Sequence, residues 1–159
     1  LTYLECSSNQ LSILPVLPNG LKRLYCSSNK LSVLPVLPNG LSALICTANQ
    51  LTSLDVLPTS LTHLGCGNNK IISLPSLPSG LTSLWCNHNL LTSLPVLPFG
   101  LGDLVCSNNQ LTSLPVLPSK LTKLSCDINS SLTCLPFLPS TLRFLYVDNT
   151  MHYVCYTRK

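Results

Sequence analysis

Leucines recur along this chain in a pattern that repeats every 20 residues, and the polar positions between them repeat with it. Each repeat follows the pattern L-x-x-L-x-C-x-x-N-x-L-x-x-L-P-x-L-P-x-G, where x varies. Positions 4 and 6 alternate with variable residues, which is the period of a β-strand with one face turned inward. The other leucines recur at spacings that fit no single helix face. We therefore expect them to meet in a common core as the chain coils.

Eight such repeats cover nearly the whole chain, and the eighth begins one residue late because of an insertion near Ser130 and Ser131. One coil of this length is too thin to bury its own leucines, so its stability comes from stacking on its neighbours. Stacked strands would lie about 4.8 Å apart in a parallel sheet. The repeats start at Leu1, Leu21, Leu41, Leu61, Leu81, Leu101, Leu121 and Leu142.

The remaining fixed positions predict how each coil turns. Asparagine at position 9 follows the strand, and its amide can donate and accept, so stacked copies would form an internal ladder. All 13 prolines fall at positions 15 and 18. Proline fixes φ and lacks a donor, so this side is expected to be extended, near polyproline II. Glycine at position 20, in four repeats, is expected to close the turn to the next strand. These four are Gly20, Gly40, Gly80 and Gly100.

The predicted fold class is an α/β-type solenoid with almost no helix and about eight coils. One parallel β-sheet would lie on the concave side, with extended or polyproline II segments on the convex side and modest curvature. We assign residues 1–159 to this single solenoid, with residues 148–159 as a degenerate C-terminal cap. The chain starts in mid-pattern without a methionine, which suggests a part of a longer polypeptide. The bare N-terminal edge predicts cover by preceding sequence or edge-to-edge self-association.

The core L-x-x-L-x-C-x-x-N-x-L resembles the signature of the leucine-rich repeat family. The 20-residue length with L-P-x-L-P is similar to the bacterial subclass, which is known from effectors that Gram-negative pathogens inject into host cells. Cysteine at position 6 is more like the repeats of amoeba-infecting giant viruses and amoeba-associated bacteria. The resemblance implies a solenoid that binds a protein partner. It does not extend to the effectors' helical hairpin or ubiquitin-ligase domain, so no ligase activity is expected.

Two columns of variable residues are expected to face outward on the sheet, because they alternate with positions 4 and 6. No two adjacent repeats agree in either column, whereas the framework positions barely change. Position 3 reads Tyr3, Arg23, Ala43, His63, Ser83, Asp103, Lys123 and Phe144. Position 5 reads Glu5, Tyr25, Ile45, Gly65, Trp85, Val105, Ser125 and Tyr146.

The large side chains in these columns favour a protein- or peptide-binding face, since aromatic anchors are enriched in binding hot spots. Relaxed drift on a solvent-exposed face is the alternative interpretation. A second function class is a structural or self-assembling spacer within a larger protein. The candidate partner-binding residues are Tyr3, Glu5, Arg23, Tyr25, Ile45, His63, Trp85, Asp103, Val105, Lys123, Phe144 and Tyr146.

Charge and hydropathy argue against other classes of partner. The net charge is +4, only 9% of residues are charged, and the cations form no run, so we predict no nucleic-acid partner. No apolar stretch approaches the roughly 18 residues of a membrane span, so no membrane partner is predicted. Glu5 and Arg23 are close enough in register for a surface ion pair, which would be incidental.

The sequence suggests no catalytic site. His63, Ser83 and Asp103 fall in one column, but a catalytic triad needs histidine between the nucleophile and the carboxylate. We also expect the sheet to be flat, without a concave pocket. His88, at position 8, is interpreted as a solvated turn residue. We therefore predict that the protein is not an enzyme.

Seven cysteines form the inward column at position 6, where cysteine acts as a small hydrophobe. Neighbouring strands give the wrong geometry for disulfides, and no C-x-x-C pair suggests a metal or cofactor. Free thiols in this number favour a reducing compartment, that is, the cytoplasm, or the host cytoplasm for an effector or viral protein. Cys134 and Cys155 lie outside the column, and their pairing is left open. The sequon at Asn129 is interpreted as accidental, because Asn129 belongs to the expected ladder.

Overall fold

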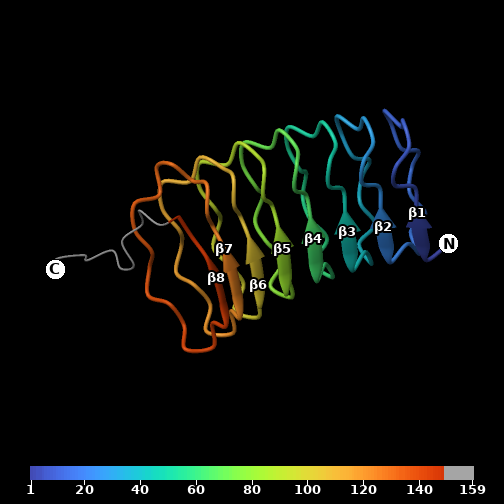
Figure 1. Ribbon diagram of the computed structural model, residues 1–159. Helices are drawn as coiled ribbons and strands as arrows, with labels where there is room; N and C mark the ends of the chain where they lie inside the picture. Colours follow the sequence, from blue (N-terminus) through green and yellow to red (C-terminus); the bar gives the residue numbers. More distant parts are fainter. Residues whose placement is uncertain (149–159) are drawn as a thin grey trace.

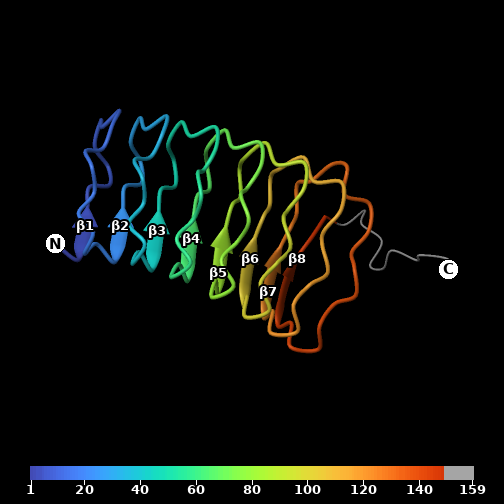
Figure 2. The same ribbon diagram turned by 180° about the vertical axis from the view of Figure 1, so that it is seen from behind.

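The computed structural model describes residues 1–148, which form a series of coils stacked in chain order, with one short β-strand in each. The strands are three residues long because only positions 3 to 5 of each repeat are extended and paired. All neighbours pair in parallel and in chain order, so the sheet runs along the whole stack (Figures 1 and 2). The strands are β1 (Tyr3–Glu5), β2 (Arg23–Tyr25), β3 (Ala43–Ile45), β4 (His63–Gly65), β5 (Ser83–Trp85), β6 (Asp103–Val105), β7 (Lys123–Ser125) and β8 (Phe144–Tyr146).

The register aligns equal positions of successive repeats. Leu4 pairs with Leu24, and Leu24 pairs with Leu44. The same holds through β8, where the inserted residue shifts the numbering by one and Leu124 pairs with Leu145. Because a strand alternates its side chains between two faces, this register places each column of the repeat on one face of the sheet. The parallel solenoid predicted from the sequence is confirmed, and the described residues contain no helix.

The core lies between the sheet and the extended segments opposite it. Leucines at positions 1, 4 and 11 and cysteines at position 6 are fully buried in the interior coils, as at Leu41, Leu44, Cys46 and Leu51. Leucines at positions 14 and 17 are buried or half-buried on the far side. Position 16 between them points outward, and Val96 there is 86% exposed. The coil is therefore apolar inside on both sides, with a valine-rich ridge on its convex surface.

The asparagine ladder is also confirmed. The Asn49 amide donates to the carbonyls of Cys46 and Thr47 in its own coil and of Cys26 in the preceding coil. Its Oδ1 accepts the amide of Leu31. Equivalent bonds recur from Asn29 to Asn129, so each asparagine satisfies backbone groups that the turn would otherwise leave buried and unpaired. Asn129 is buried in this ladder, which supports the interpretation of its sequon as accidental.

The turn after each strand has an unexpected backbone conformation. Position 8 has a positive φ of 51–56° in seven consecutive repeats, while no described glycine does. The turn at positions 19 and 20 forms where the sequence predicts it, but its glycines have ordinary φ angles. Glycine there does not supply the left-handed conformation, and other residues take its place in other repeats. The positions with positive φ are Ser8, Ser28, Ala48, Asn68, His88, Asn108 and Ile128.

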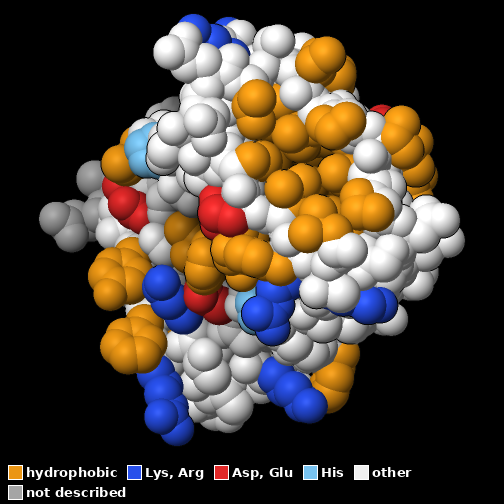
Figure 3. Space-filling model, turned by 90° about the vertical axis from the view of Figure 1, so that its right-hand side faces the viewer, with side chains coloured by type: hydrophobic (Ala, Val, Ile, Leu, Met, Phe, Trp, Pro, Cys, Tyr) orange, Lys and Arg blue, Asp and Glu red, His pale blue; other side chains and the backbone are white. Residues whose placement is uncertain are grey.

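The structure describes the N-terminal end of the stack from Leu1 and the C-terminal end as far as Asp148. β1 pairs with β2 alone among the described strands, and Leu1 is 73% exposed beside it. Figure 3 looks onto this end and shows hydrophobic side chains gathered over it. The predicted C-terminal cap falls, apart from Asp148, on residues 149–159 and lies outside the described residues, as does the question of whether Cys155 pairs. The described part of the chain has no apolar helix of membrane-spanning length.

Candidate functional site

The outward columns at positions 3 and 5 are placed on the open face of the sheet, as the alternation predicts. In β5, Leu84 is fully buried while Trp85 beside it is 41% exposed. In β2, Leu24 is buried and Tyr25 is half-buried. The large side chains of the columns therefore stand over a buried layer that holds them in place.

Two aromatic rings are in contact on the first two coils. The rings of Tyr3 and Tyr25 meet edge to face, with centroids 5.4 Å apart and an interplanar angle of 89°. The Tyr3 hydroxyl donates to the Glu5 carboxylate at 2.9 Å, and the Ser7 amide donates to the same carboxylate at 2.9 Å. Hydrogen bonding from Ser7 lowers the pKa of Glu5, and the bond to Glu5 raises the pKa of Tyr3. The carboxylate faces these groups, so the suggested ion pair with Arg23 does not form.

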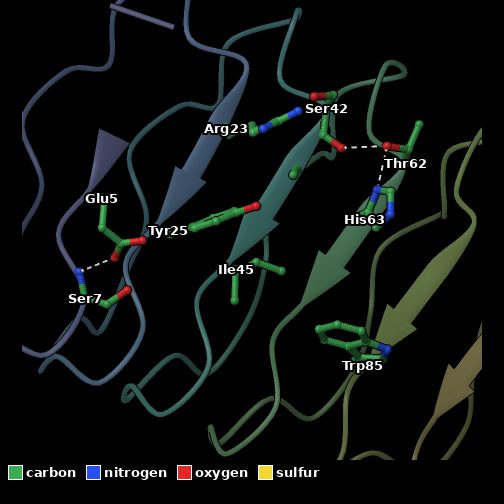
Figure 4. A pocket seen from close by; sticks show the side chains of 10 residues that line it. Glu5, Ser7, Arg23, Tyr25, Ser42, Ile45, Thr62, His63 and Trp85 are labelled. Atoms are coloured by element: carbon green, nitrogen blue, oxygen red, sulfur yellow. Dashed lines mark hydrogen bonds between the residues drawn. The ribbon is translucent and has the colours of Figure 1, made fainter. Parts of the chain in front are cut away.

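The sheet is not flat, and this corrects the sequence analysis. A hollow of about 520 Å³ opens on its outer face between β1 and β5. Its lining includes the small residue Ala43, which follows Arg23 at position 3, and Ile45 and Trp85 at position 5, which stand on either side of Gly65. Figure 4 shows Tyr25 and Ile45 on one side of the hollow and Trp85 on the other.

Polar groups line the rim of the hollow on the position-3 side. The Thr62 hydroxyl lies 3.0 Å from the Ser42 carbonyl and 2.8 Å from Nδ1 of His63. Arg23 lies on the same rim, and its side chain points towards Ser42 (Figure 4). The hollow thus has an apolar floor and a cationic and hydroxyl-bearing edge.

Beyond the hollow, Trp85 is held by the next strand. Its indole Nε1 donates to Asp103 at 3.0 Å. The other carboxylate oxygen of Asp103 lies 3.9 Å from Nζ of Lys123. These contacts cross β5, β6 and β7, so they orient the indole towards the hollow and leave its ring face available. The sequence analysis named all three residues but did not anticipate that they form one group.

The candidate residues do not all meet in one place. Seven of them lie at or beside the hollow, namely Tyr3, Glu5, Arg23, Tyr25, Ile45, His63 and Trp85. Asp103, Val105 and Lys123 lie on the next two strands, where Asp103 holds the indole of Trp85. The other two, Phe144 and Tyr146, lie apart at the far end of the sheet in β8. The sequence analysis missed the rim residues at positions 2 and 7, since serine and threonine there carry no individual signal. These residues are Ser7, Ser42 and Thr62; Ala43 also lines the hollow, and it was in the outward column at position 3 but not among the candidates.

The position-3 residues His63, Ser83 and Asp103 are not arranged for acid–base or nucleophilic chemistry. His63 pairs with Ser83, and Ser83 pairs with Asp103, so serine stands in the middle as the register predicts. Nδ1 of His63 is engaged by Thr62, and Asp103 is engaged by Trp85. Within residues 1–148, no group of three or more His, Cys, Asp or Glu side chains is placed to hold a metal ion.

The cysteine column consists of free thiols from Cys6 to Cys126, and all but Cys6 are buried. Burial raises the pKa of Cys66 to about 12, and it raises the pKa of Cys46 well above its usual range. A thiol that stays protonated is a poor nucleophile and metal ligand. The column therefore serves as core packing, as predicted.

Comparison with known proteins gives matches to one fold. The family model "Leucine Rich repeats (2 copies)" matches residues 59–99. Among solved structures, YopM from Yersinia enterocolitica is 37% identical with a TM-score of 0.84; the match covers 93% of this chain and 37% of that one. YopM from Yersinia pestis, titled a leucine-rich effector protein, is 33% identical with a TM-score of 0.82, at coverages of 93% and 49%. This chain thus spans less than half the length of either. No curated protein matches.

A Shigella effector leucine-rich repeat domain is 30% identical with a TM-score of 0.81, and the match covers 92% of this chain and 68% of that domain. The functional domain of InlJ from Listeria monocytogenes is 31% identical with a TM-score of 0.65, covering 94% of this chain and 44% of that one. Its title reports a cysteine ladder. Together with the repeat, the parallel register and the asparagine ladder, these matches show that the chain belongs to the leucine-rich repeat family.

Proposed function

We propose that this chain is a non-enzymatic protein-binding module, and that a protein or peptide partner docks on the open face of its sheet. One observation carries the proposal: the framework is copied from repeat to repeat, while the outward columns differ in every repeat and place exposed aromatics around a hollow. An exposed face with Tyr3, Tyr25 and Trp85 has the composition of a binding hot spot. The bound partner would bury these rings.

The setting we propose is the cytoplasm, and the host cytoplasm for an injected or viral protein. The effector structures similar to this chain support it, as do the free thiols of the cysteine column. The likeness of the position-6 cysteine to repeats of amoeba-infecting viruses and amoeba-associated bacteria remains a prediction. Nucleic acid and membranes are not proposed as partners, because the cations are scattered and few.

The test compares capture of partners by the wild-type chain with capture by a double variant, Tyr25→Ala with Trp85→Ala. The matched control is Val96→Ala with Val116→Ala, which removes apolar surface from the convex ridge. We expect the double variant on the sheet to lose the proteins that the wild type and the ridge control retain. Circular dichroism confirms that all three chains are folded. If the sheet variant retains the same proteins, the open face is not the binding site.

A second candidate function is a structural or self-assembling spacer of a larger protein. The observation in its favour is the β1 end, where one strand has an unpaired edge within the described residues and leucine side chains are exposed. Unpaired strand edges pair readily with other chains. A mass that rises with concentration would favour this function, whereas a protein that binds partners as a monomer would not.

A further inference from the structure

The hollow between β1 and β5 has a shape that suits one large side chain of a partner. Gly65 lies between Ile45 and Trp85 in the position-5 column, and a Cβ atom built on it would lie 3.0 Å from Cδ1 of Ile45. The side chain of Ile45 therefore lies over Gly65 and forms part of the lining of the hollow. At about 520 Å³, the hollow falls within the 300–1,000 Å³ range of ligand pockets.

The rim of the hollow carries two nitrogen-bearing side chains, and the guanidinium of Arg23 is the one that can bind a carboxylate. Arg23 and His63 flank Ala43 in the position-3 column, about 10 Å apart at the backbone because two strand spacings separate them. Ala43 carries only a methyl group and is buried, so Arg23 and His63 are the side chains of these three that are exposed at the rim. This edge is where a planar anion could bind the guanidinium in a bidentate manner.

The hydrogen bonds of the rim determine how His63 is presented. The Thr62 hydroxyl donates its proton to the Ser42 carbonyl, so its oxygen is left to accept from Nδ1–H of His63. We assign this tautomer from the hydrogen-bond arrangement. Nδ1 is thereby engaged within the protein, and Nε2 is left as an acceptor for an N–H group of the partner.

The charges of the site favour an acidic partner. The one ion pair among the described residues joins Lys123 to Asp103, so Arg23 has no carboxylate partner there. The acid nearest to it in the lining, Glu5, accepts hydrogen bonds from Tyr3 and Ser7 instead. Glu5 keeps its negative charge on the β1 side of the lining, and the unpaired cation Arg23 is the group that selects for a negative group on the partner.

We propose that the hollow recognises a peptide segment with a large apolar side chain next to a carboxylate residue. The proposal rests on the proposed function and names its partner chemistry. The apolar side chain lies on Tyr25, Ile45 and Trp85, and the carboxylate binds the guanidinium of Arg23 beside His63. Aspartate and glutamate both meet this requirement, whereas a neutral amide does not.

Trp85 is the only tryptophan in the chain, so its fluorescence reports directly on the hollow. The probe is the tripeptide acetyl-Phe-Glu-Gly-amide, compared with its Phe-Gln-Gly and Ala-Glu-Gly counterparts. We expect saturable changes in emission with the first peptide at millimolar concentrations, which is the affinity range of small ligands with few contacts. Both counterparts should bind about tenfold more weakly, since each lacks one of the two recognised groups.

Three variants complete the test. Gly65→Leu displaces the Ile45 side chain that lines the hollow and should abolish the change. Arg23→Gln should weaken binding of the Phe-Glu peptide about tenfold while leaving the Phe-Gln peptide unaffected. Arg143→Gln removes the same charge from an exposed site beside β8 and should bind as the wild type does. Since Arg23 is exposed, its substitution tests the proposal even if Gly65→Leu does not fold.

Two outcomes would overturn the inference. One is equal binding of the glutamate and glutamine peptides, and the other is the absence of any saturable change. Either result is distinguishable from failure of the proposed function, because Tyr25→Ala with Trp85→Ala would still release a captured protein partner. If the double variant loses partner capture but the wild type does not bind the peptide, the proposed binding function stands and the partner chemistry proposed here is wrong.

Discussion

At position 8, single residues carry a backbone conformation that their side chains disfavour. L-amino acids other than asparagine and aspartate rarely adopt a left-handed φ, because Cβ approaches the backbone carbonyl. Asn68 and Asn108 suit the conformation, whereas Ala48 and Ile128 do not. The stacking of the coil imposes it regardless of the residue, since the amide of each position 8 from Ser8 to Asn108 bonds to the next coil. Strain is therefore distributed unequally among otherwise similar repeats.

Ile128 gives a direct prediction, because it combines a φ of 55° with a β-branched side chain that is 57% exposed. Ile128→Asn relieves the clash and removes little buried apolar surface. We expect the free energy of unfolding to rise by about 1 kcal/mol. The measurement is urea unfolding followed by circular dichroism.

The control for this prediction is Val116→Asn, which makes a similar exchange at an exposed position without positive φ. It should change stability by less than about 0.5 kcal/mol. A loss of stability in Ile128→Asn, or a change no larger than that of the control, would show that the left-handed turn is not strained.

At the scale of the structural element, the asparagine ladder joins one coil to the next. Asn49→Ala leaves the buried Leu31 amide without a partner, whereas the Cys26 and Cys46 carbonyls each keep one donor from a neighbouring asparagine. One buried group left unpaired costs about 1–3 kcal/mol, and two further hydrogen bonds are lost, so we expect a loss of about 3 kcal/mol in urea unfolding.

The end of the ladder provides the matched comparison. Asn9 is exposed and donates only to the Cys6 and Ser7 carbonyls of its own coil. Asn9→Ala should therefore cost only about 1 kcal/mol. Equal losses for Asn9→Ala and Asn49→Ala would contradict the view that the ladder stabilises contacts between coils.

The cysteine column is a second element with a measurable property. Burial keeps its interior thiols protonated, with the pKa of Cys66 raised to about 12, while Cys6 is only half-buried. A thiol whose pKa is raised has less thiolate at a given pH. At pH 8 we therefore expect iodoacetamide to label Cys6 long before Cys66 in the folded protein, as measured by peptide mass spectrometry. In guanidinium chloride both should react alike. Rapid labelling of Cys66 in the native protein would mean that the column opens to solvent.

At the scale of the whole molecule, the repeat explains which features the sequence could predict. A strict period of 20 residues aligns equal positions, so the pairing of Leu24 with Leu44 and the inward column of thiols follow from counting. The hollow does not follow in the same way. It depends on how the side chain of Ile45 lies over Gly65 and on Asp103, which holds the indole of Trp85 from the next strand. Such contacts depend on side-chain conformations that no period encodes.

The direction of Glu5 illustrates the same limit. Register alone places it within reach of Arg23, but the Ser7 amide in its own coil and the Tyr3 hydroxyl compete for its carboxylate. Local hydrogen bonds are favoured over a solvent-exposed ion pair, which contributes at most about 1 kcal/mol. As a consequence Arg23 is left with a free charge at the hollow. The property most relevant to binding therefore arises from a contact that the sequence did not predict.

The β1 end gives a prediction for the chain of residues 1–159 taken by itself. Its strand edge is unpaired within the described residues, and Leu1 is exposed beside the half-buried Leu4 and Leu11. Both the open edge and the apolar surface favour association with another chain. We expect light scattering during gel filtration to show a mass that rises above 17.2 kDa with concentration. Leu1→Lys should suppress this rise by placing a charge at the edge, whereas Val96→Lys on the convex ridge should not. A monomeric mass at every concentration, or equal behaviour of the two variants, would exclude association through this end.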